Sequence, residues 1–418
     1  MGSPNFPART VLFQKEPNGV TYRVPALLYL PSPPCLLAFC EQRVTPADTQ
    51  AKLLVLRRGT FYPNGVEWED MTVLDSAQLE GCRSMNPCPV YDRFTGTVFL
   101  FFIAVLGNTS ESLQLITGKN VTRLCCVSSQ DRGKTWSSVM DMTLAVIGDA
   151  IKDWATFALG PGHGIQLRSG RLLVPAYAYH IGRRRRFGQP CETTPRSFCL
   201  HSDTHGRSWC RGEAVPSLES VECQVVSVDQ QDGGDVLYCN ARSPLGFRVQ
   251  ALSLDGGIVF RDSQLVPKLI EPPHGCHGSV VGFPAPISQP GKSKEASSYG
   301  QNLLTPTWVV YSHPTWPSGR QDLGVHLSPF PRDPDSWSPP WVIYQGPSAY
   351  SDLAYLEPAA PASPLAGAFA CVFESGSLTP YDQISFCVFT LHELFNNIPE
   401  HKPAQSRNSR LCGLCIIS

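Results

Sequence analysis

The chain has 418 residues, of which 42% are hydrophobic and 10% aromatic, enough apolar side chains for a large buried core. Its 34 basic and 35 acidic side chains nearly cancel, so a formal net charge of −1 gives no electrostatic reason to expect a nucleic-acid partner. The 38 prolines and 34 glycines favour a loop-rich, all-β protein over a helical one.

Short β-segments divided by glycine and proline recur along the chain. Each is rich in β-branched or aromatic residues, which strands prefer. We expect strands at residues 53–56, 97–106, 171–179, 235–239, 307–311 and 369–373. No long stripe of apolar residues at helical spacing occurs, and the region from Val139 to Phe157 is expected to hold at most one short helix.

An eight-residue pattern, S-x-D-x-G-x-T-W, occurs three times. Residues 129–136 match it at every position, and residues 253–260 have Val259 and Phe260 in the last two places. Residues 202–209 are a degenerate copy, with Thr204 in the place of Asp and Ser208 in the place of Thr. Asp and Gly suit a tight hairpin turn, and the final aromatic residue can anchor that turn on a sheet. Repeats at this spacing predict a β-propeller.

Five further local motifs occur in sequence order: Arg23 in YRVP, Glu222 in VECQ, Arg242 in NARS, Arg320 in GRQDLG and Tyr350 in AYSDL. Alone, each has a simpler explanation: a surface charge, the outward face of a strand, or a core tyrosine. Together, over nearly the whole chain, they resemble the active site of the exo-α-sialidases, specifically the vertebrate cytosolic and plasma-membrane type. The repeated turn resembles the Asp box of that family.

The resemblance implies a six-bladed β-propeller whose active site lies on the central axis, with the Asp boxes away from it. It also implies a retaining exo-α-sialidase in which Arg23, Arg242 and Arg320 hold the substrate carboxylate. Arginine suits that role because its planar fork bonds a carboxylate through two parallel hydrogen bonds and never loses its charge. Tyr350 is the implied nucleophile and Glu222 the base that it needs, since tyrosine has a reference pKa of about 10.

Six further positions match residues of the family's pocket. Asp48 corresponds to the acid/base aspartate, and because it must be protonated to donate, an acidic optimum is expected. Arg43 corresponds to a further arginine near the substrate carboxylate. Positions that line the sugar pocket are matched by Asn86, Glu111, Tyr177 and Tyr179.

Two other classes of function compete with the enzyme. One is a lectin-like propeller that binds sialosides at a membrane without turnover, and the other is a propeller scaffold for protein partners. The filled catalytic positions argue against the first, and a costly cluster of arginines argues against the second. Linkage preference, the choice between glycolipid and glycoprotein substrates, and oligomeric state are left open by the sequence.

The sixteen cysteines do not point to a secreted disulfide scaffold, because the first residues lack the apolar core of a signal peptide. We expect synthesis in the cytosol and reduced thiols. Neither Cys125 with Cys126 nor Cys82 with Cys88 has the spacing of a zinc site, and neither a metal nor a cofactor is expected. The longest apolar run, residues 98–106, is too short to cross a bilayer.

The chain ends in Cys415-Ile-Ile-Ser, a C-a-a-X pattern of the farnesylation form, and Cys412 is placed for a second acyl chain. Two lipid signals hold a protein at a membrane where one binds reversibly. We expect a catalytic domain at residues 1–397, a flexible tether at 398–418 and a peripheral membrane location; the alternative is a terminus that ends this way by chance. The arginines from Arg183 to Arg186 form either a solvated loop or a contact with anionic lipid.

Overall fold

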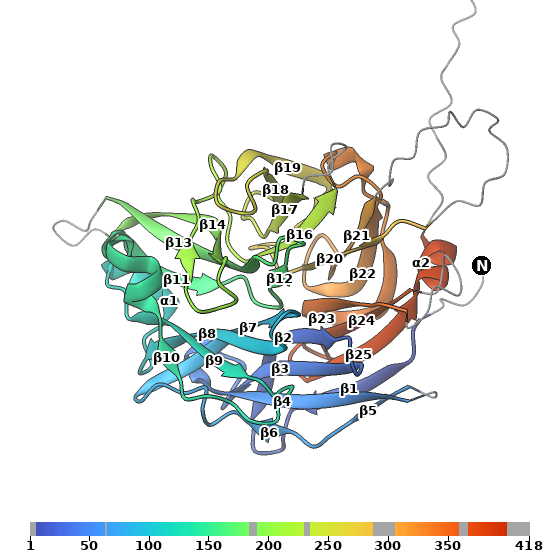
Figure 1. Ribbon diagram of the computed structural model, residues 1–418, viewed down its shortest axis with the longest axis horizontal. Helices are drawn as coiled ribbons and strands as arrows, with labels where there is room; N and C mark the ends of the chain where they lie inside the picture. The colour runs from blue at the N-terminus through green and yellow to red at the C-terminus, as the bar shows by residue number, and fades with distance from the viewer. Residues whose placement is uncertain are drawn as a thin grey trace, which may run out of the picture.

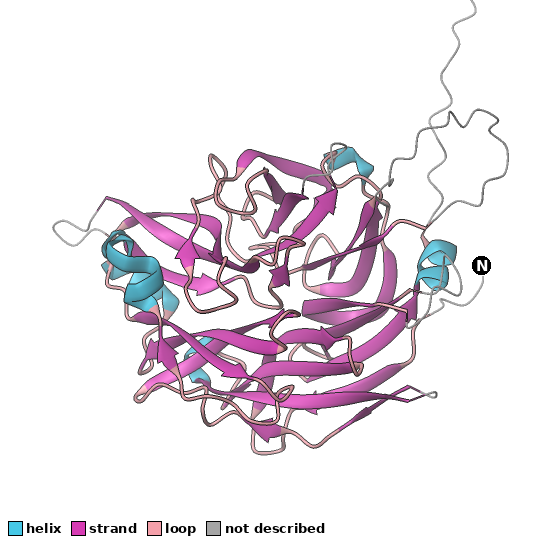
Figure 2. Ribbon diagram, viewed as in Figure 1, coloured by secondary structure: helices cyan, strands magenta, loops and turns pink. Residues whose placement is uncertain are grey.

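The computed structural model describes residues 6–62, 65–183, 190–229, 235–286, 306–358 and 367–398. In this part of the chain, antiparallel sheets stand around a central axis as the blades of a propeller (Figure 1). Figure 2 shows that strands and loops make up nearly all of it, with a few short helices at the periphery. None of the described helices is long and apolar enough to cross a membrane.

The blades follow one another in chain order, each with its innermost strand first. Blade one contains β2 (Thr21–Leu30), β3 (Cys35–Arg43), β4 (Ala51–Tyr62) and β5 (Gly65–Trp68), with β6 (Thr72–Val73) beside β4. Blade two contains β7 (Cys82–Asp92), β8 (Thr97–Leu106), β9 (Thr122–Ser129) and β10 (Met140–Asp141). Blade three contains β11 (Trp154–Leu159), β13 (Leu172–Arg183), β14 (Glu192–Ser202) and β15 (Cys210–Arg211), with β12 (Ile165–Gln166) beside β13.

The remaining three blades complete the ring. Blade four contains β16 (Cys223–Asp229), β17 (Asp235–Ala241), β18 (Phe247–Ser253) and β19 (Arg261–Ile270). Blade five contains β20 (Ser279–Pro284), β21 (Thr307–Pro314), β22 (Gln321–Ser328) and the first half of β23 (Trp341–Leu356). Blade six contains the second half of β23, β24 (Ala368–Ser375), β25 (Gln383–Thr390) and β1 (Arg9–Gln14).

Two strands, β23 and β1, close the ring of blades. The long strand β23 pairs with β22 up to Pro347 and with β24 from Ser348 onward, so it ends one blade and begins the next. The first strand of the chain, β1, pairs with β25 as the outermost strand of blade six, and Figure 1 shows the two ends of the fold side by side. The predicted six-bladed propeller is confirmed for the described residues.

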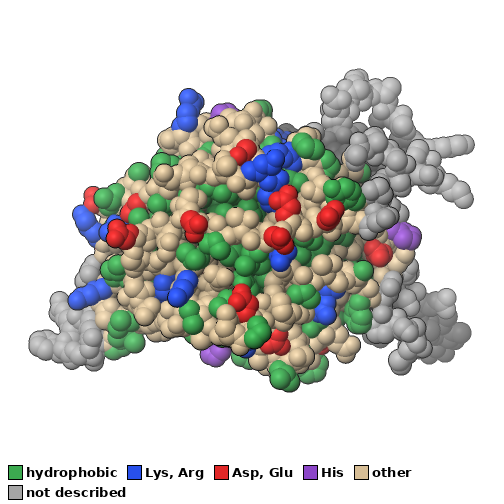
Figure 3. Space-filling model, turned by 90° about the horizontal axis from the view of Figure 1, so that it is seen from below, with side chains coloured by type: hydrophobic (Ala, Val, Ile, Leu, Met, Phe, Trp, Pro, Cys, Tyr) green, Lys and Arg blue, Asp and Glu red, His purple; other side chains and the backbone are tan. Residues whose placement is uncertain are grey.

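The hydrophobic core lies in layers between neighbouring blades. The inner strands are buried on both faces and therefore read as almost continuous apolar runs, as in β2. Aromatic side chains join one blade to the next: Trp68 meets Phe386 with ring centroids 5.0 Å apart, and Phe101 meets Trp209 at 4.6 Å. On the surface shown in Figure 3, acidic and basic side chains lie near one another, with hydrophobic side chains between them.

One buried carboxylate ties the inner strands together. Asp352 in β23 accepts hydrogen bonds from the Leu27 backbone N–H at 2.7 Å, the Gln224 amide at 2.9 Å and the Ser279 hydroxyl at 2.8 Å. These partners lie on β2, β16 and β20, three different blades. A carboxylate buried in this way is stable only because its partners satisfy it, so it fixes the distances between the inner strands around the axis.

Five of the six strands predicted from the sequence lie within observed strands, and residues 97–106 match β8 from end to end. The sixth, 171–179, begins one residue before β13. The prediction for residues 139–157 was only partly right. That region contains β10, two helical turns at η2 (Thr143–Ile147) and η3 (Gly148–Asp153), and then the start of β11. The helices α1 (Glu111–Thr117) and α2 (Leu391–Asn397) and the single turns η1 (Asp48–Gln50) and η4 (Pro334–Ser336) were not predicted.

The repeated eight-residue motifs form turns between the third and fourth strands of their blades. In the first, the Asp131 carboxylate accepts from the backbone N–H of Lys134 at 3.1 Å and of Thr135 at 2.9 Å, and Trp136 packs edge-on against Phe39 of blade one. The second repeats these bonds through Asp255. In the degenerate copy, the Thr204 hydroxyl accepts from the Ser208 N–H at 2.8 Å, so the turn keeps its shape.

Candidate active site

A cavity of about 710 Å³ opens at one end of the propeller axis. Its walls include loops that join the second and third strands of the blades, and we call this side of the propeller the cavity face. The structure brings all eleven predicted catalytic and substrate-binding residues to this one cavity: Arg23, Arg43, Asp48, Asn86, Glu111, Tyr177, Tyr179, Glu222, Arg242, Arg320 and Tyr350. They come from every blade, so only the closed ring assembles them.

A larger cavity of about 920 Å³ lies at the other end of the axis, around the far ends of β2, β16 and β20. Its lining is mostly apolar, and none of the predicted site residues borders it. Volume alone does not identify an active site, whereas the convergence of charged and hydrogen-bonding groups does. We therefore place the candidate site in the smaller cavity.

At the centre of that cavity, the Tyr350 hydroxyl donates a hydrogen bond to the Glu222 carboxylate, and both side chains are buried. The Arg242 guanidinium lies 2.7 Å from Glu222 and 3.1 Å from the Tyr350 oxygen. Burial, and then the nearby Glu222 charge, raise the pKa of Tyr350 well above its ordinary value. Burial opposes ionisation of Glu222, but Arg242, His277 and the hydrogen bond from Tyr350 together outweigh it and lower the pKa of that carboxyl. The pair therefore holds a neutral phenol against an ionised base.

The three predicted arginines surround the Tyr350 ring. The guanidinium carbons of Arg23 and Arg320 lie 5.7 Å and 5.5 Å from its centroid. Arg23 is held by Glu374, whose carboxylate accepts from its Nε at 3.0 Å and also from the Tyr350 backbone N–H at 3.2 Å. One buried carboxylate thus positions both an arginine and the tyrosine.

Arg320 differs from the other two arginines in its partners. It donates to the Gly275 carbonyl at 3.1 Å and to the Tyr381 hydroxyl at 3.3 Å, both neutral groups. Within the described residues no carboxylate lies within ion-pair distance of Arg320, whereas Arg23 has two and Arg242 has one. A half-buried cation without an anion is costly, so this corner of the cavity favours an anionic ligand.

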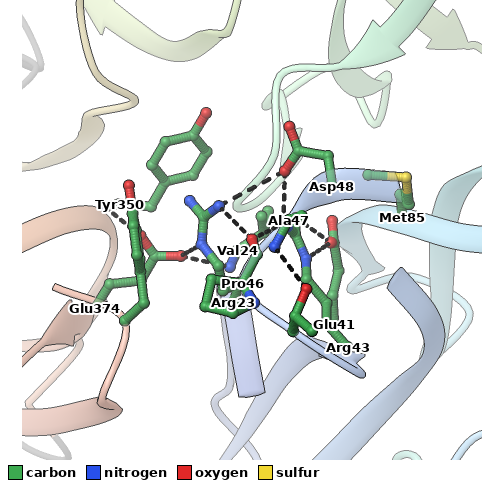
Figure 4. Close-up of polar contacts among 12 residues, drawn as sticks. Arg23, Val24, Glu41, Arg43, Pro46, Ala47, Asp48, Met85, Tyr350 and Glu374 are labelled. Atoms are coloured by element: carbon green, nitrogen blue, oxygen red, sulfur yellow. Dashed lines mark hydrogen bonds and ion pairs between the residues drawn. The ribbon is translucent and has the colours of Figure 1, made fainter. Parts of the chain in front are cut away.

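Asp48 lies at the edge of the cavity, in the loop that follows β3 (Figure 4). Its side chain is 72% exposed, and its carboxylate lies 2.5 Å from Arg43 and 3.6 Å from Arg23. Partial desolvation favours the neutral acid, but the two arginines prevail and hold the pKa of Asp48 below its ordinary value. Arg43 is fixed in turn by the buried carboxylate of Glu41, which accepts from its Nε at 2.8 Å. In the ligand-free site Asp48 is therefore ionised at neutral pH, and the acidic optimum expected from the sequence stays a prediction.

The four pocket residues occupy the wall on the side of blades two and three. Asn86 has a φ of 54°, and its N–H donates to Glu41 at 2.7 Å. The rings of Tyr177 and Tyr179 lie 6.1 Å apart, edge to face. Glu111 begins α1 at the cavity mouth, where desolvation and then the Glu222 charge raise the pKa of its carboxyl to about 7.

Four residues that support this site were not found in the sequence. Glu41 and Glu374 stand in apolar runs, LLAFCEQR and FACVFES, and a carboxylate in a buried strand was a signal available to sequence reasoning. His277 is fully buried with its ring 5.2 Å from that of Tyr350, and burial lowers its pKa to about 4. Tyr381 lies under Arg23 at 4.0 Å. Neither of these two had a recognisable local pattern.

Some predicted features lie outside the described residues: the lipidation candidates Cys412 and Cys415, and three of the four consecutive arginines. The fourteen cysteines in the described part of the chain form no disulfide bond with one another. Over the same part, no cluster of three or more His, Cys, Asp or Glu side chains is arranged to hold a metal ion.

Comparison with known proteins gives one consistent result. A family model described as a BNR repeat-like domain matches residues 36–359. Sialidase-4 of Mus musculus is 48% identical over 99% of both chains, and Sialidase-3 of Homo sapiens is 45% identical over 94% of this chain and 95% of its own. Among solved structures, the Hadza microbial sialidase Hz136 superposes with a TM-score of 0.69 at 22% identity, covering 90% of this chain and 67% of its own. At that identity the superposition supports the fold.

Proposed function

The chain belongs to the sialidase family and is an exo-α-sialidase, a glycoside hydrolase, and from this premise we propose how its own residues act on the substrate. Its substrates are sialoconjugates. We assign terminal α-linked sialic acid as the bound sugar, the arginine cluster as the group that holds its carboxylate, and Tyr350 as the nucleophile. The observation that carries this proposal is the hydrogen-bonded pair of Tyr350 and Glu222 beside three guanidiniums.

The arginines select the substrate. Arg320 lacks an anionic partner among the described residues, and a carboxylate attached to the reacting carbon would supply one. Arg23 and Arg242 add charge on two other sides while Glu374 and Glu222 hold them in place. Because the guanidiniums are fixed before binding, little side-chain entropy is lost when the ligand arrives.

The first chemical step forms a bond between the Tyr350 oxygen and the anomeric carbon. Glu222 takes the phenolic proton, Asp48 gives a proton to the leaving oxygen, and the glycosidic bond breaks. A neutral phenol approaches the anionic sugar more easily than a carboxylate would. In the second step Asp48 removes a proton from water, the water oxygen attacks the anomeric carbon, and Tyr350 leaves with a proton from Glu222. Two displacements at one carbon retain its configuration.

Asp48 changes its protonation when substrate binds. In the ligand-free site, Arg43 and Arg23 keep it ionised. A bound carboxylate places a negative charge beside these arginines and weakens their effect on Asp48, so its pKa rises toward the value that an acid catalyst needs. Substrate thus prepares its own proton donor.

Trapping the covalent intermediate tests the nucleophile. One solved structure similar to this fold, Trypanosoma rangeli sialidase with 2,3-difluorosialic acid, is described as a covalent intermediate; it covers 93% of this chain and 59% of its own at 14% identity, with a TM-score of 0.64. We expect the same reagent to add one sugar to this chain, and peptide mass spectrometry to locate it on Tyr350. Tyr350→Phe, which keeps the ring, should gain no mass. A modified Glu222 or Asp48 in the wild-type protein would contradict the assignment.

Gangliosides, oligosaccharides and glycoproteins are the proposed natural substrates, and the protein is proposed to act at a membrane surface. The support is the C-terminal Cys415-Ile-Ile-Ser pattern with Cys412 nearby, on a tether at residues 398–418 that follows the catalytic domain at 1–397. Mass spectrometry of the mature C-terminal peptide tests this directly. An unmodified full-length end would overturn the lipid anchor without touching the proposed catalysis.

A further inference from the structure

Most of the loops that join second and third strands share one property besides their place around the cavity. Residues of four of these loops line it, and a fifth, between β24 and β25, contributes Tyr381 to Arg23 and Arg320. Among the described residues, five of the six loops also expose a large apolar side chain to solvent. These side chains are Val44, Leu113, Ile116, Leu245, Trp316 and Leu378.

The apolar side chains stand next to the residues that form the site. Leu245 follows Pro244 of the cavity wall, Val44 follows Arg43, and Leu113 lies between two wall residues of α1. The remaining second-to-third loop, between β13 and β14, follows Arg183, which ends β13 and lies 4.0 Å from Glu192 of β14. Exposed apolar groups on five of the six loops thus stand around the cavity mouth.

The arrangement of these exposed side chains around the cavity limits what kind of partner can bind them. A partner that covers all of these loops also covers the cavity, and the enzyme then works only if the partner itself presents the substrate. The apolar groups stand on separate loops of different blades, so each can enter a fluid surface independently without a matching rigid shape. Tryptophan and aliphatic side chains at such a tip are typical of contact with a membrane interface.

We propose that the cavity face is a membrane-docking surface, on which Val44, Leu113, Ile116, Leu245, Trp316 and Leu378 enter the headgroup region and turn the cavity toward sialic acids carried by glycolipids. This inference rests on the proposed function, since it names where that substrate lies. It is separate from the C-terminal lipid pattern, because the loops are built into the propeller.

Vesicle binding without any sialic acid tests the surface independently of catalysis. The full chain is produced in a host that does not prenylate it, and flotation with vesicles of phosphatidylcholine and phosphatidylserine is measured. The variant Leu113→Ser, Trp316→Ser, Leu378→Ser removes three side chains that are between 51% and 89% exposed. The matched control Phe94→Ser, Leu254→Ser, Phe330→Ser removes three that are between 52% and 70% exposed on loops of the opposite face.

We expect the first variant to lower the vesicle partition coefficient by about tenfold or more, because each large apolar side chain gains free energy on leaving water. The control variant should bind vesicles as the wild type does. Both should hydrolyse a soluble sialoside at the wild-type rate, while only the first should lose rate on a sialoglycolipid in vesicles.

Three results would overturn the proposal: wild-type protein that does not float with vesicles, equal losses of binding in both variants, or a wild-type dimer that the first variant converts to monomer. The last would assign the ring to a second copy of the chain. Failure of the soluble-substrate assay in the wild type would reject the proposed function instead, and leave the vesicle result standing.

Discussion

The two faces of the propeller are built from the same strands but use their polar groups in opposite ways. On the face of the repeated motifs, the Asp131 carboxylate accepts from the turn that it belongs to, and the turn is complete without a ligand. On the cavity face, Arg320 and Asp48 reach past their own loops toward a shared space. One face therefore contributes mainly to folding and the other mainly to chemistry, and substitutions should separate the two.

The largest effect should come from Tyr350→Phe on the cavity face. Removing one oxygen deletes the proposed nucleophile but leaves the ring between Arg23 and Arg320. We expect kcat to fall by about 10³-fold or more, with the melting temperature nearly unchanged. Hydrolysis of a fluorogenic α-sialoside and a thermal melt on the same sample measure both. A variant that keeps more than a tenth of the wild-type rate would reject tyrosine as the nucleophile.

Arg320→Lys should have the next largest effect, a fall in kcat/KM of about 10²-fold, because lysine keeps the charge but loses the planar fork that matches a carboxylate. The matched control is Arg171→Lys, on the opposite face, where the guanidinium bonds both oxygens of Asp203. That change removes a similar pair of bonds and should leave kcat/KM unchanged. Equal losses of kcat/KM in both variants would mean that Arg320 affects activity only through the stability of the fold.

The dependence of kcat/KM on pH should reveal the titration of Glu111 at the cavity mouth. Its raised pKa of about 7 means that the group is neutral below that pH and adds a negative charge to an anion-binding cavity above it. We expect kcat/KM to fall several-fold as pH rises through about 7, in addition to any acidic limb from Asp48. Glu111→Gln is neutral throughout and should lose the limb near neutrality. An unchanged profile in that variant would assign the limb to another group.

The sequence predicted the strands well because glycine and proline mark their ends and branched residues fill them. It missed α1 for a physical reason: Leu113 and Ile116 face solvent and only Gln114 is buried, so no apolar stripe points to a core. The helix α2 had a readable start, since Thr390 and Glu393 form a capping box.

The site was predicted through the positions of its charged residues, but not through the contacts that hold them. Glu374 meets Arg23 across 351 residues of chain, a pairing that depends on how the blades close. The same closure brings β1 to β25. Local patterns cannot report such pairings, because nothing near either residue specifies its partner.

On the opposite face, Asp131→Ala should lower the free energy of unfolding and leave the turnover rate unchanged. The carboxylate accepts from two backbone N–H groups and from the Thr135 hydroxyl, bonds comparable to those of a helix N-cap. We expect a loss of about 1 to 2 kcal/mol in the free energy of unfolding, read from chemical denaturation. Turnover of a soluble sialoside by the folded protein should match the wild type. A loss of turnover without unfolding would show that the two faces are coupled.

The smallest effect should be a gain, from Thr204→Asp in the degenerate turn. Thr204 has one side-chain oxygen, which accepts from the Ser208 N–H, and the Arg207 N–H must use the Thr204 carbonyl at 3.3 Å. A carboxylate would accept from both N–H groups, as Asp131 does, but it would stand beside the exposed Asp203 and lose part of that gain to repulsion. We therefore expect about 0.5 kcal/mol of added stability and no change in activity. The substitution adds a negative charge on the face opposite the cavity. A change in kcat/KM would mean that this charge acts on the active site along the propeller axis. The two faces would then be coupled through electrostatics.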